Sequence, residues 1–176
     1  FARGRVDADL QQEGARMSGT APLFLMEATV VADWVDYNDH LNDAFYVLIF
    51  SKSGDALLER IGLGVEGRAT LQRTIYTTDL IVHYLREVKL GETVRVNARI
   101  LEADGKRIRI WFEMAHPAGG LAASSEQIYL CVDQTGDKPR AAAWPEPVGA
   151  AIDQLVAAQD SAPWPEAAGR GIALKR

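Results

Sequence analysis

The spacing of hydrophobic residues changes along this chain. From Phe45 to Ile61 they recur three or four positions apart, which is typical of a helix. From residue 92 to 115 they alternate with polar residues, which is typical of half-buried strands. Residues 23–35 are rich in β-branched and apolar side chains and contain neither Gly nor Pro, so they predict a first strand. The order is therefore strand, long helix, then strands.

The start of the predicted helix is marked by its local sequence. Asn42 is a good N-cap, and Asp43 places a carboxylate in the first turn, where it suits the helix dipole. Leu41 and Tyr46 occupy the two positions of a hydrophobic staple. The first half of the helix is apolar nearly all round, and such a helix is buried on most sides. A sheet wrapped around it would provide that cover.

Turn signals divide the rest of the chain. Asp104-Gly105 and the residues 117–120 each indicate a hairpin, and residues 135–139 end the sheet. The expected strands after the helix are 70–84, 92–101, 107–115 and 121–132, followed by a short amphipathic helix over 148–159. We expect an α+β fold in which one curved antiparallel sheet wraps a long central helix. One small sheet leaves part of that helix exposed, so we also expect a homodimer or homotetramer.

The domain boundaries follow from these elements. Residues 1–20 are interpreted as a disordered or added leader, with Met17 as the natural start. Residues 21–145 are expected to form the main domain, and residues 146–176 a C-terminal helix and tail that pack on it. No segment has the length of a membrane span.

Composition narrows the function classes. The formal net charge of −5 argues against nucleic acid as the main partner, because phosphate backbones need a basic face. The single cysteine, Cys131, excludes an internal disulfide framework and suits a reducing, cytoplasmic compartment. No Cys/His grouping has metal-ligand spacing, no serine-nucleophile elbow occurs, and the glycines form no phosphate loop.

Candidate chemistry is concentrated just before the long helix. The stretch from Trp34 to Tyr46 holds three carboxylates, one of the three histidines and two amides, directly against the apolar run 44–50. Polar groups that can do chemistry thus lie beside the segment expected to be buried. We interpret this stretch as the active-site corner.

The same stretch resembles a known family. The sequence Val-Asp-Tyr-Asn-Asp-His-Leu-Asn-Asp-Ala-Phe-Tyr, residues 35–46, is similar to the motif of hotdog-fold acyl-CoA thioesterases of the 4-hydroxybenzoyl-CoA thioesterase-like group. The branch most similar is that of betainyl-CoA thioesterases, which is associated with carnitine breakdown. Further agreement lies in residues 76–91, 104–107, 122–133 and 169–170.

The resemblance implies a function and roles. It implies hydrolysis of a short acyl-CoA thioester without cofactor or metal, with Asp36 as base or nucleophile and the helix start near Asn42 as oxyanion site. His40 would bind the substrate or hold Asp36. Burial or the nearby Asp39 is expected to raise the pKa of Asp36. The simpler alternatives are that Asp36 caps a turn, Asn42 is only an N-cap and His40 bonds backbone.

Five further residues are candidates for substrate binding. Asp39 stands where the family usually has Gly, so it narrows the site, adds a carboxylate or stands in for a cap. Asp79 occupies a place where family members often carry an acidic residue near the neighbouring subunit's site. Arg107 and Arg109 share a strand face and would meet the CoA phosphates, although solvated surface charge also explains them. Tyr46 is the fifth: if the acyl group is a quaternary ammonium such as betainyl, aromatic faces should line its pocket, and Trp34, Tyr37 and Trp111 are candidates beside Tyr46.

Two other functions are compatible with the sequence. One is a non-catalytic acyl-CoA binder in which Asp39 has spoiled the site. The other is an enoyl-CoA hydratase, a chemistry that uses an Asp and a His for proton transfer at the acyl chain.

Overall fold

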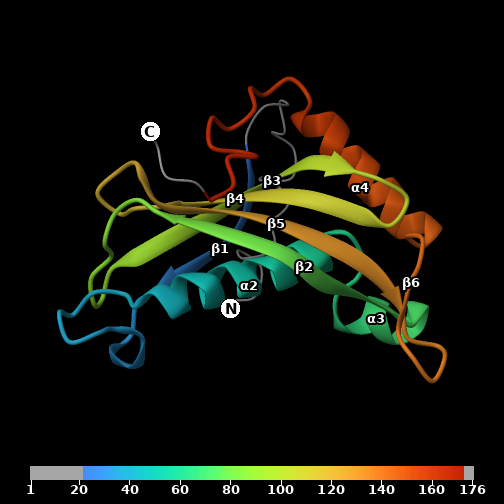
Figure 1. Ribbon diagram of the computed structural model, residues 1–176, viewed down its shortest axis with the longest axis horizontal. Helices are drawn as coiled ribbons and strands as arrows, with labels where there is room; N and C mark the ends of the chain where they lie inside the picture. Colours follow the sequence, from blue (N-terminus) through green and yellow to red (C-terminus); the bar gives the residue numbers. More distant parts are fainter. Residues whose placement is uncertain (1–21, 173–176) are drawn as a thin grey trace, which may run out of the picture.

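The computed structural model describes residues 22–172 and shows one curved sheet with a long helix against its inner face (Figure 1). The sheet order is β1-β3-β4-β5-β2, all neighbours are antiparallel, and β6 pairs with β5. The elements are β1 (Leu23–Thr29), a 3-10 helix η1 (Ala32–Trp34), α2 (Asp43–Arg60), α3 (Val65–Leu71), β2 (Arg73–Tyr84), β3 (Thr93–Ala103), β4 (Arg107–Ala115), β5 (Leu121–Asp133), β6 (Arg140–Ala141) and α4 (Glu146–Gln159). The predicted α+β class is confirmed, and the arrangement is a hotdog fold.

The core lies between α2 and the inner face of the sheet. Ile49, Phe50 and Leu57 of α2 are fully buried. Phe50 meets Phe112 of β4 with ring centroids 6.0 Å apart. The strands contribute every second residue to this core, as the alternation predicted, including Val94, Val96, Ile108, Ile110 and Met114.

A glycine makes room for an aromatic side chain of the sheet. A Cβ added to Gly54, in the middle of α2, would lie 2.2 Å from the Tyr129 hydroxyl oxygen of β5. The end of the Tyr129 side chain therefore packs on α2 at the one position where the helix carries no side chain. Burial raises the pKa of Tyr129, so its hydroxyl stays protonated under ordinary conditions.

Two predicted elements were wrong in extent. The first strand ends at Thr29 instead of residue 35, because the chain leaves the sheet there and turns through η1. Residues 70–71 belong to α3, a helix that the sequence did not predict, and β2 begins only at Arg73. The short strand β6 was not predicted either.

The helix α3 is capped by a residue of the preceding helix. Its N-cap position is Gly64, which has no side chain, so the Glu59 carboxylate accepts from the Val65 N–H at 3.1 Å instead.

The C-terminal helix covers the edge of β3. Ile152 of α4 is buried in the core, and α4 packs chiefly against β3. Gln159, 6% exposed at the end of α4, accepts from the Ile100 N–H at 3.0 Å and donates to the Ala98 carbonyl at 3.2 Å. These backbone groups lie where the pairing with β1 ends, at Leu23 opposite Ala98. The Gln159 amide thus continues the hydrogen bonding of a neighbouring strand.

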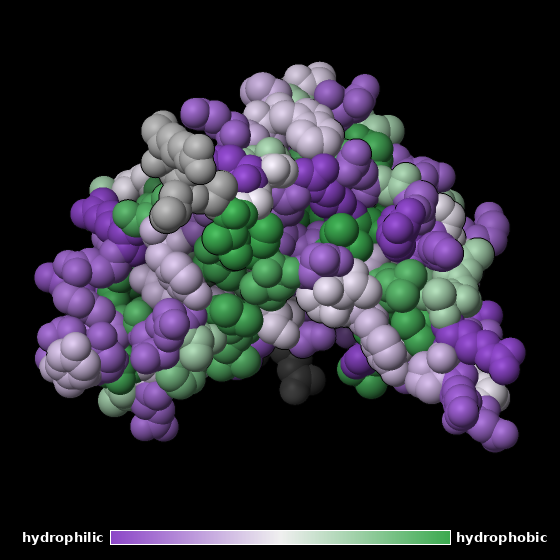
Figure 2. All heavy atoms as spheres, viewed as in Figure 1, coloured by the Kyte–Doolittle hydropathy of each residue, from purple (hydrophilic) through white to green (hydrophobic). Residues whose placement is uncertain are grey.

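The other end of the sheet is the edge strand β2. Three large apolar or aromatic residues of β2 and the residue that follows it are at least 39% exposed, namely Tyr76, Leu80, Tyr84 and Leu85. Figure 2 shows hydrophobic side chains interleaved with polar ones on the face over which β2 runs. The predicted leader, residues 1–20, lies outside the described residues, and the division into domains stays a prediction.

Candidate active site

The segment that connects η1 to α2 forms a small closed loop. The Trp34 carbonyl accepts a hydrogen bond from the Asn42 N–H at 3.0 Å. The Asp36 N–H donates to the His40 carbonyl at 2.9 Å. Val35 and Leu41 face each other as a β-bridge. The polar residues 36–40 are therefore held together at the start of the buried helix, as the sequence predicted.

Asp36 caps the loop from within. Its Oδ1 atom accepts from the backbone N–H groups of Asn38 at 2.8 Å and His40 at 3.2 Å. The Asn38 N–H above all, together with that of His40, lowers the pKa of Asp36 and outweighs desolvation. The expectation of a raised pKa was wrong, because these donors stabilise the carboxylate. Asp36 is thus an anion of low basicity. Its carboxylate does cap the turn, as the simpler alternative proposed.

Asp39 occupies a conformation that explains why glycine is common at this place. Its φ of 59° lies in the left-handed region, which Gly enters freely and Asp tolerates better than most residues. Its carbonyl accepts from the Leu90 N–H at 3.1 Å. Its side chain is exposed. Asp39 therefore makes the turn that Gly would make, and its contact with substrate stays a prediction.

The first turn of α2 is partly occupied by its own caps. Asn42 is the N-cap, and its side chain accepts from the Ala44 N–H at 3.1 Å, as predicted. The Asp43 carboxylate accepts from the same N–H at 2.9 Å, and the Asn42 carbonyl accepts from Phe45. The N–H that these contacts leave uncovered in the first turn is that of Asp43. This narrows the predicted oxyanion site to one backbone donor.

A second segment, residues 86–90, braces the loop. Leu41 donates its N–H to the Val88 carbonyl at 2.7 Å, and His40 pairs with Lys89 as a β-bridge. The His40 Nδ1 atom lies 3.3 Å from the Glu87 Oε2 atom. The sequence did not identify Glu87 as a functional residue, although it stands in the stretch 76–91 that carries the family resemblance. That stretch was the one sequence signal for Glu87.

Tyr46 supports the bracing segment from the helix. It is 4% exposed, its hydroxyl donates to the Arg86 carbonyl at 3.2 Å, and its ring meets Tyr84 edge-on with centroids 5.3 Å apart. Burial raises the pKa of Tyr46. The contacts of Tyr46 are structural, and its predicted role in binding substrate stays a prediction.

The two arginines and Asp79 lie away from the loop. Arg107 Nε and Nη2 donate to the Asp104 Oδ2 atom at 2.9 and 2.7 Å, inside the β3–β4 hairpin. Arg109 bonds Glu126 at 2.6 Å and Glu102 at 2.8 Å. Asp79 is exposed on β2 and accepts from Thr78 at 2.8 Å. Both guanidinium groups are already paired with carboxylates, so phosphate binding would require an exchange of partners.

The Asp104 pairing gives an expected pH dependence. The N–H of Lys106 and the Arg107 side chain lower the pKa of Asp104 to about 2. Because the folded pKa lies below the unfolded one of about 3.9, this stabilisation is present above pH 4 and is lost as the pH falls toward 2. We expect Asp104→Asn to lower the melting temperature at pH 6 and to have little effect at pH 2. Equal shifts at both pH values, measured by circular dichroism, would contradict this.

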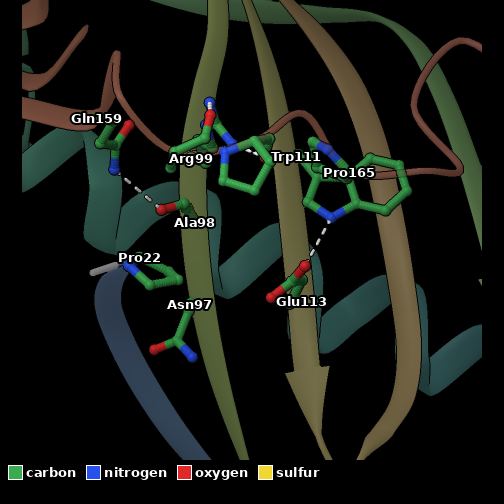
Figure 3. Close-up of a pocket in the computed structure, with 10 residues that line it drawn as sticks. Pro22, Asn97, Ala98, Arg99, Trp111, Glu113, Gln159 and Pro165 are labelled. Carbon is green, nitrogen blue, oxygen red and sulfur yellow. Dashed lines mark hydrogen bonds between the residues drawn. The ribbon is translucent and has the colours of Figure 1, made fainter. Parts of the chain in front are cut away.

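A separate cavity lies on the outer face of the sheet, under the C-terminal tail (Figure 3). Its volume is about 230 Å³, and its walls include Asn97, Arg99, Trp111, Glu113, Gln159 and Pro163. Trp111 donates its indole N–H to Glu113 at 3.1 Å, and the Arg99 guanidinium donates to the Ala162 and Pro163 carbonyls. No residue of the loop 36–40 lines this cavity, so Trp111 is not part of the loop site.

Within residues 22–172, no group of three His, Cys, Asp or Glu side chains is arranged to hold a metal ion. None of the helices in that range combines the length and hydrophobicity needed to cross a membrane.

Comparisons with known proteins agree with this fold. A model of the Thioesterase-like superfamily matches residues 30–167. The chain is 42% identical over 117 residues to a betainyl-CoA thioesterase of Pseudomonas aeruginosa, covering 66% of this chain and 72% of that protein. A protein of Staphylococcus aureus whose structure was solved in complex with CoA superposes with a TM-score of 0.81, at 28% identity, over 89% of this chain and 98% of that one.

Some relatives are much longer than this chain. An L-carnitine dehydrogenase/betainyl-CoA thioesterase of Agrobacterium fabrum is 38% identical over 112 residues, which are 64% of this chain but 23% of that protein. The likeness therefore concerns one part of such proteins.

Proposed function

This chain belongs to the Thioesterase-like superfamily and is a thioesterase, and from that premise we propose that it hydrolyses a short acyl-CoA with a cationic acyl group, betainyl-CoA above all. The observation that carries the proposal is the loop 36–40, which holds Asp36 and His40 at the start of the buried helix α2. Asp36 acts on the attacking water or on the thioester carbon, and the Asp43 N–H at the start of α2 meets the oxyanion.

The charge around the loop favours a cationic acyl group. Asp36 and Asp39 lie in the loop, Asp43 begins α2, and the bracing segment adds Glu87 together with the cations Arg86 and Lys89. Four carboxylates against two cations leave this small region net negative, which favours a quaternary ammonium over an anionic acyl group. Tyr37, 95% exposed beside Asp36, adds an aromatic face of the kind that binds such cations.

A homodimer completes this proposal. β2 is the edge of the sheet and carries the exposed Tyr76, Leu80 and Tyr84. An unpaired, partly apolar edge strand is a ready surface for pairing with a second copy. Light scattering of the full chain measures its mass directly, and a monomer would contradict this part of the proposal.

The test is an assay of free thiol over a matched panel of substrates. Betainyl-CoA is compared with 3,3-dimethylbutanoyl-CoA, which has the same shape without the charge, and with the anionic succinyl-CoA. We expect kcat/KM to be highest for betainyl-CoA, and its advantage over the neutral isostere to shrink as salt is added. Thiol release from the neutral isostere at the same kcat/KM would contradict the choice of acyl group but leave the thioesterase intact.

The variant Asp39→Gly distinguishes a non-catalytic acyl-CoA binder from an enzyme. The left-handed φ of Asp39 suits glycine, so this variant keeps the turn. If Asp39 had spoiled the site, the wild-type chain would bind CoA esters in calorimetry without releasing thiol, and Asp39→Gly would restore release. We expect the wild-type chain to release thiol and Asp39→Gly to change kcat by less than about threefold, because at this place Asp already forms the required turn. A hydratase would instead consume enoyl absorbance without releasing thiol.

A further inference from the structure

Glu87 contacts the imidazole of His40 from a different part of the chain. Its Oε2 atom lies 3.3 Å from the Nδ1 atom of His40. The side chain of Glu87 is 58% exposed and that of His40 is 30% exposed, so this pair adds little to stability. Of the three histidines, only His40 lies in the loop with Asp36.

The backbone that presents Glu87 is fixed on several sides. The Glu87 carbonyl lies 3.1 Å from the Nε2 atom of His116, and the His116 Nδ1 atom accepts from the Ala118 N–H at 3.0 Å. Nε2 of His116 is therefore the donor in its contact with Glu87. The neighbouring carbonyls of Arg86 and Val88 accept from the Tyr46 hydroxyl and from the Leu41 N–H at 3.2 and 2.7 Å. An exposed carboxylate is thus carried by a rigid support.

On the other side, the backbone of His40 is equally fixed. Its N–H donates to Asp36 Oδ1 at 3.2 Å, its carbonyl accepts from the Asp36 N–H at 2.9 Å, and it pairs with Lys89 as a β-bridge. Both partners of the His40–Glu87 contact therefore rest on backbone that is bonded to the same loop. Such support is what distinguishes a positioned pair from a mobile surface ion pair.

The contact favours one form of the imidazole. The carboxylate charge 3.3 Å from Nδ1 favours the neutral form in which Nδ1 carries the proton and Nε2 keeps its lone pair. A neutral imidazole oriented in this way by a carboxylate is suited to accept a proton from water. Asp36 is less suited to that step, because the N–H groups of Asn38 and His40 lower its pKa.

We propose that Glu87 is a positioning residue for thioester hydrolysis, holding His40 so that its Nε2 atom accepts the proton of the attacking water. This inference rests on the proposed function. The water oxygen bonds to the thioester carbon as its proton passes to Nε2. The tetrahedral intermediate then breaks its C–S bond, and CoA leaves as a thiolate that takes the proton back from the imidazolium. Asp36 orients the water.

The kinetic test compares Glu87→Gln and Glu87→Ala with Asp33→Asn. Asp33 is an exposed residue of η1, and its substitution changes the net charge by the same amount as either Glu87 variant. We expect kcat for the best acyl-CoA of the panel to fall about 10-fold in Glu87→Gln and up to about 100-fold in Glu87→Ala, with KM for the neutral 3,3-dimethylbutanoyl-CoA within about twofold. Asp33→Asn is expected to match the wild-type chain.

The spectroscopic test reports the position of the proton without any turnover. In ¹⁵N spectra of the full-length chain, His40→Gln identifies the His40 signals among those of three histidines. We expect protonated Nδ1 in the neutral imidazole of the wild-type chain and a shift toward the Nε2–H form in Glu87→Ala. A lowered kcat with an unchanged tautomer would refute the positioning role.

The two proposals fail in different ways. If the wild-type chain releases thiol and Glu87→Gln has wild-type kcat, the role of Glu87 is refuted and the thioesterase stands. If the wild-type chain releases no thiol from any acyl-CoA, the proposed function falls, and the catalytic part of this inference falls with it.

Discussion

Replacing Asp36 with Asn is expected to lower kcat by about 100-fold or more while leaving the fold intact. Asn has the same shape as Asp, and its side-chain oxygen can still accept from the N–H groups of Asn38 and His40 at 2.8 and 3.2 Å. The loop therefore keeps its cap. What the variant loses is the negative charge, which orients water or attacks the thioester carbon.

The measurement is steady-state thiol release, together with a melting curve for each variant. Asp33→Asn serves as the matched control, because it removes a nearby carboxylate that is exposed in η1. We expect only the Asp36 variant to lose activity, with both melting temperatures close to that of the wild-type chain. Full turnover by Asp36→Asn would show that its carboxylate only caps the turn.

Replacing Gln159 with Leu is expected to lower the free energy of unfolding by about 2–4 kcal/mol, since each buried polar group left without a partner costs about 1–3 kcal/mol. The groups concerned are the Ile100 N–H and the Ala98 carbonyl, which Gln159 bonds at 3.0 and 3.2 Å. Leu fills a similar volume but satisfies neither. Loss of packing therefore contributes little to the expected change.

The control for this variant lies on the same helix. Gln154 is exposed on α4, so Gln154→Leu makes the same chemical change without removing buried hydrogen bonds. Urea unfolding of the two variants gives both free energies. We expect Gln154→Leu to remain within about 0.5 kcal/mol of the wild-type chain, and equal losses in the two variants would contradict the role of Gln159 at the β3 edge.

The sequence predicted correctly those elements that depend on residues close together in the chain. The N-cap at Asn42, the alternation in β3 and β4 and the hairpin at Asp104 depend on residues close together in the chain, and all three are present in the structure. The end of the first strand was predicted wrongly, and α3 was not predicted. Where β1 ends depends on its pairing with β3, and the cap of α3 comes from Glu59 on the preceding helix.

The candidate site shows the same division. The sequence by itself placed Asp36, His40 and Asn42 together, because they lie within seven residues of one another before a buried helix. It predicted a raised pKa for Asp36, whereas the folded loop supplies two N–H donors that lower it. Only the tertiary structure brought Glu87 to His40, 47 positions away, because that contact depends on how residues 86–90 pair with the loop. The local spacing of residues determines whether a segment forms a helix, a strand or a turn. Pairing between segments far apart in the chain determines which side chains come into contact.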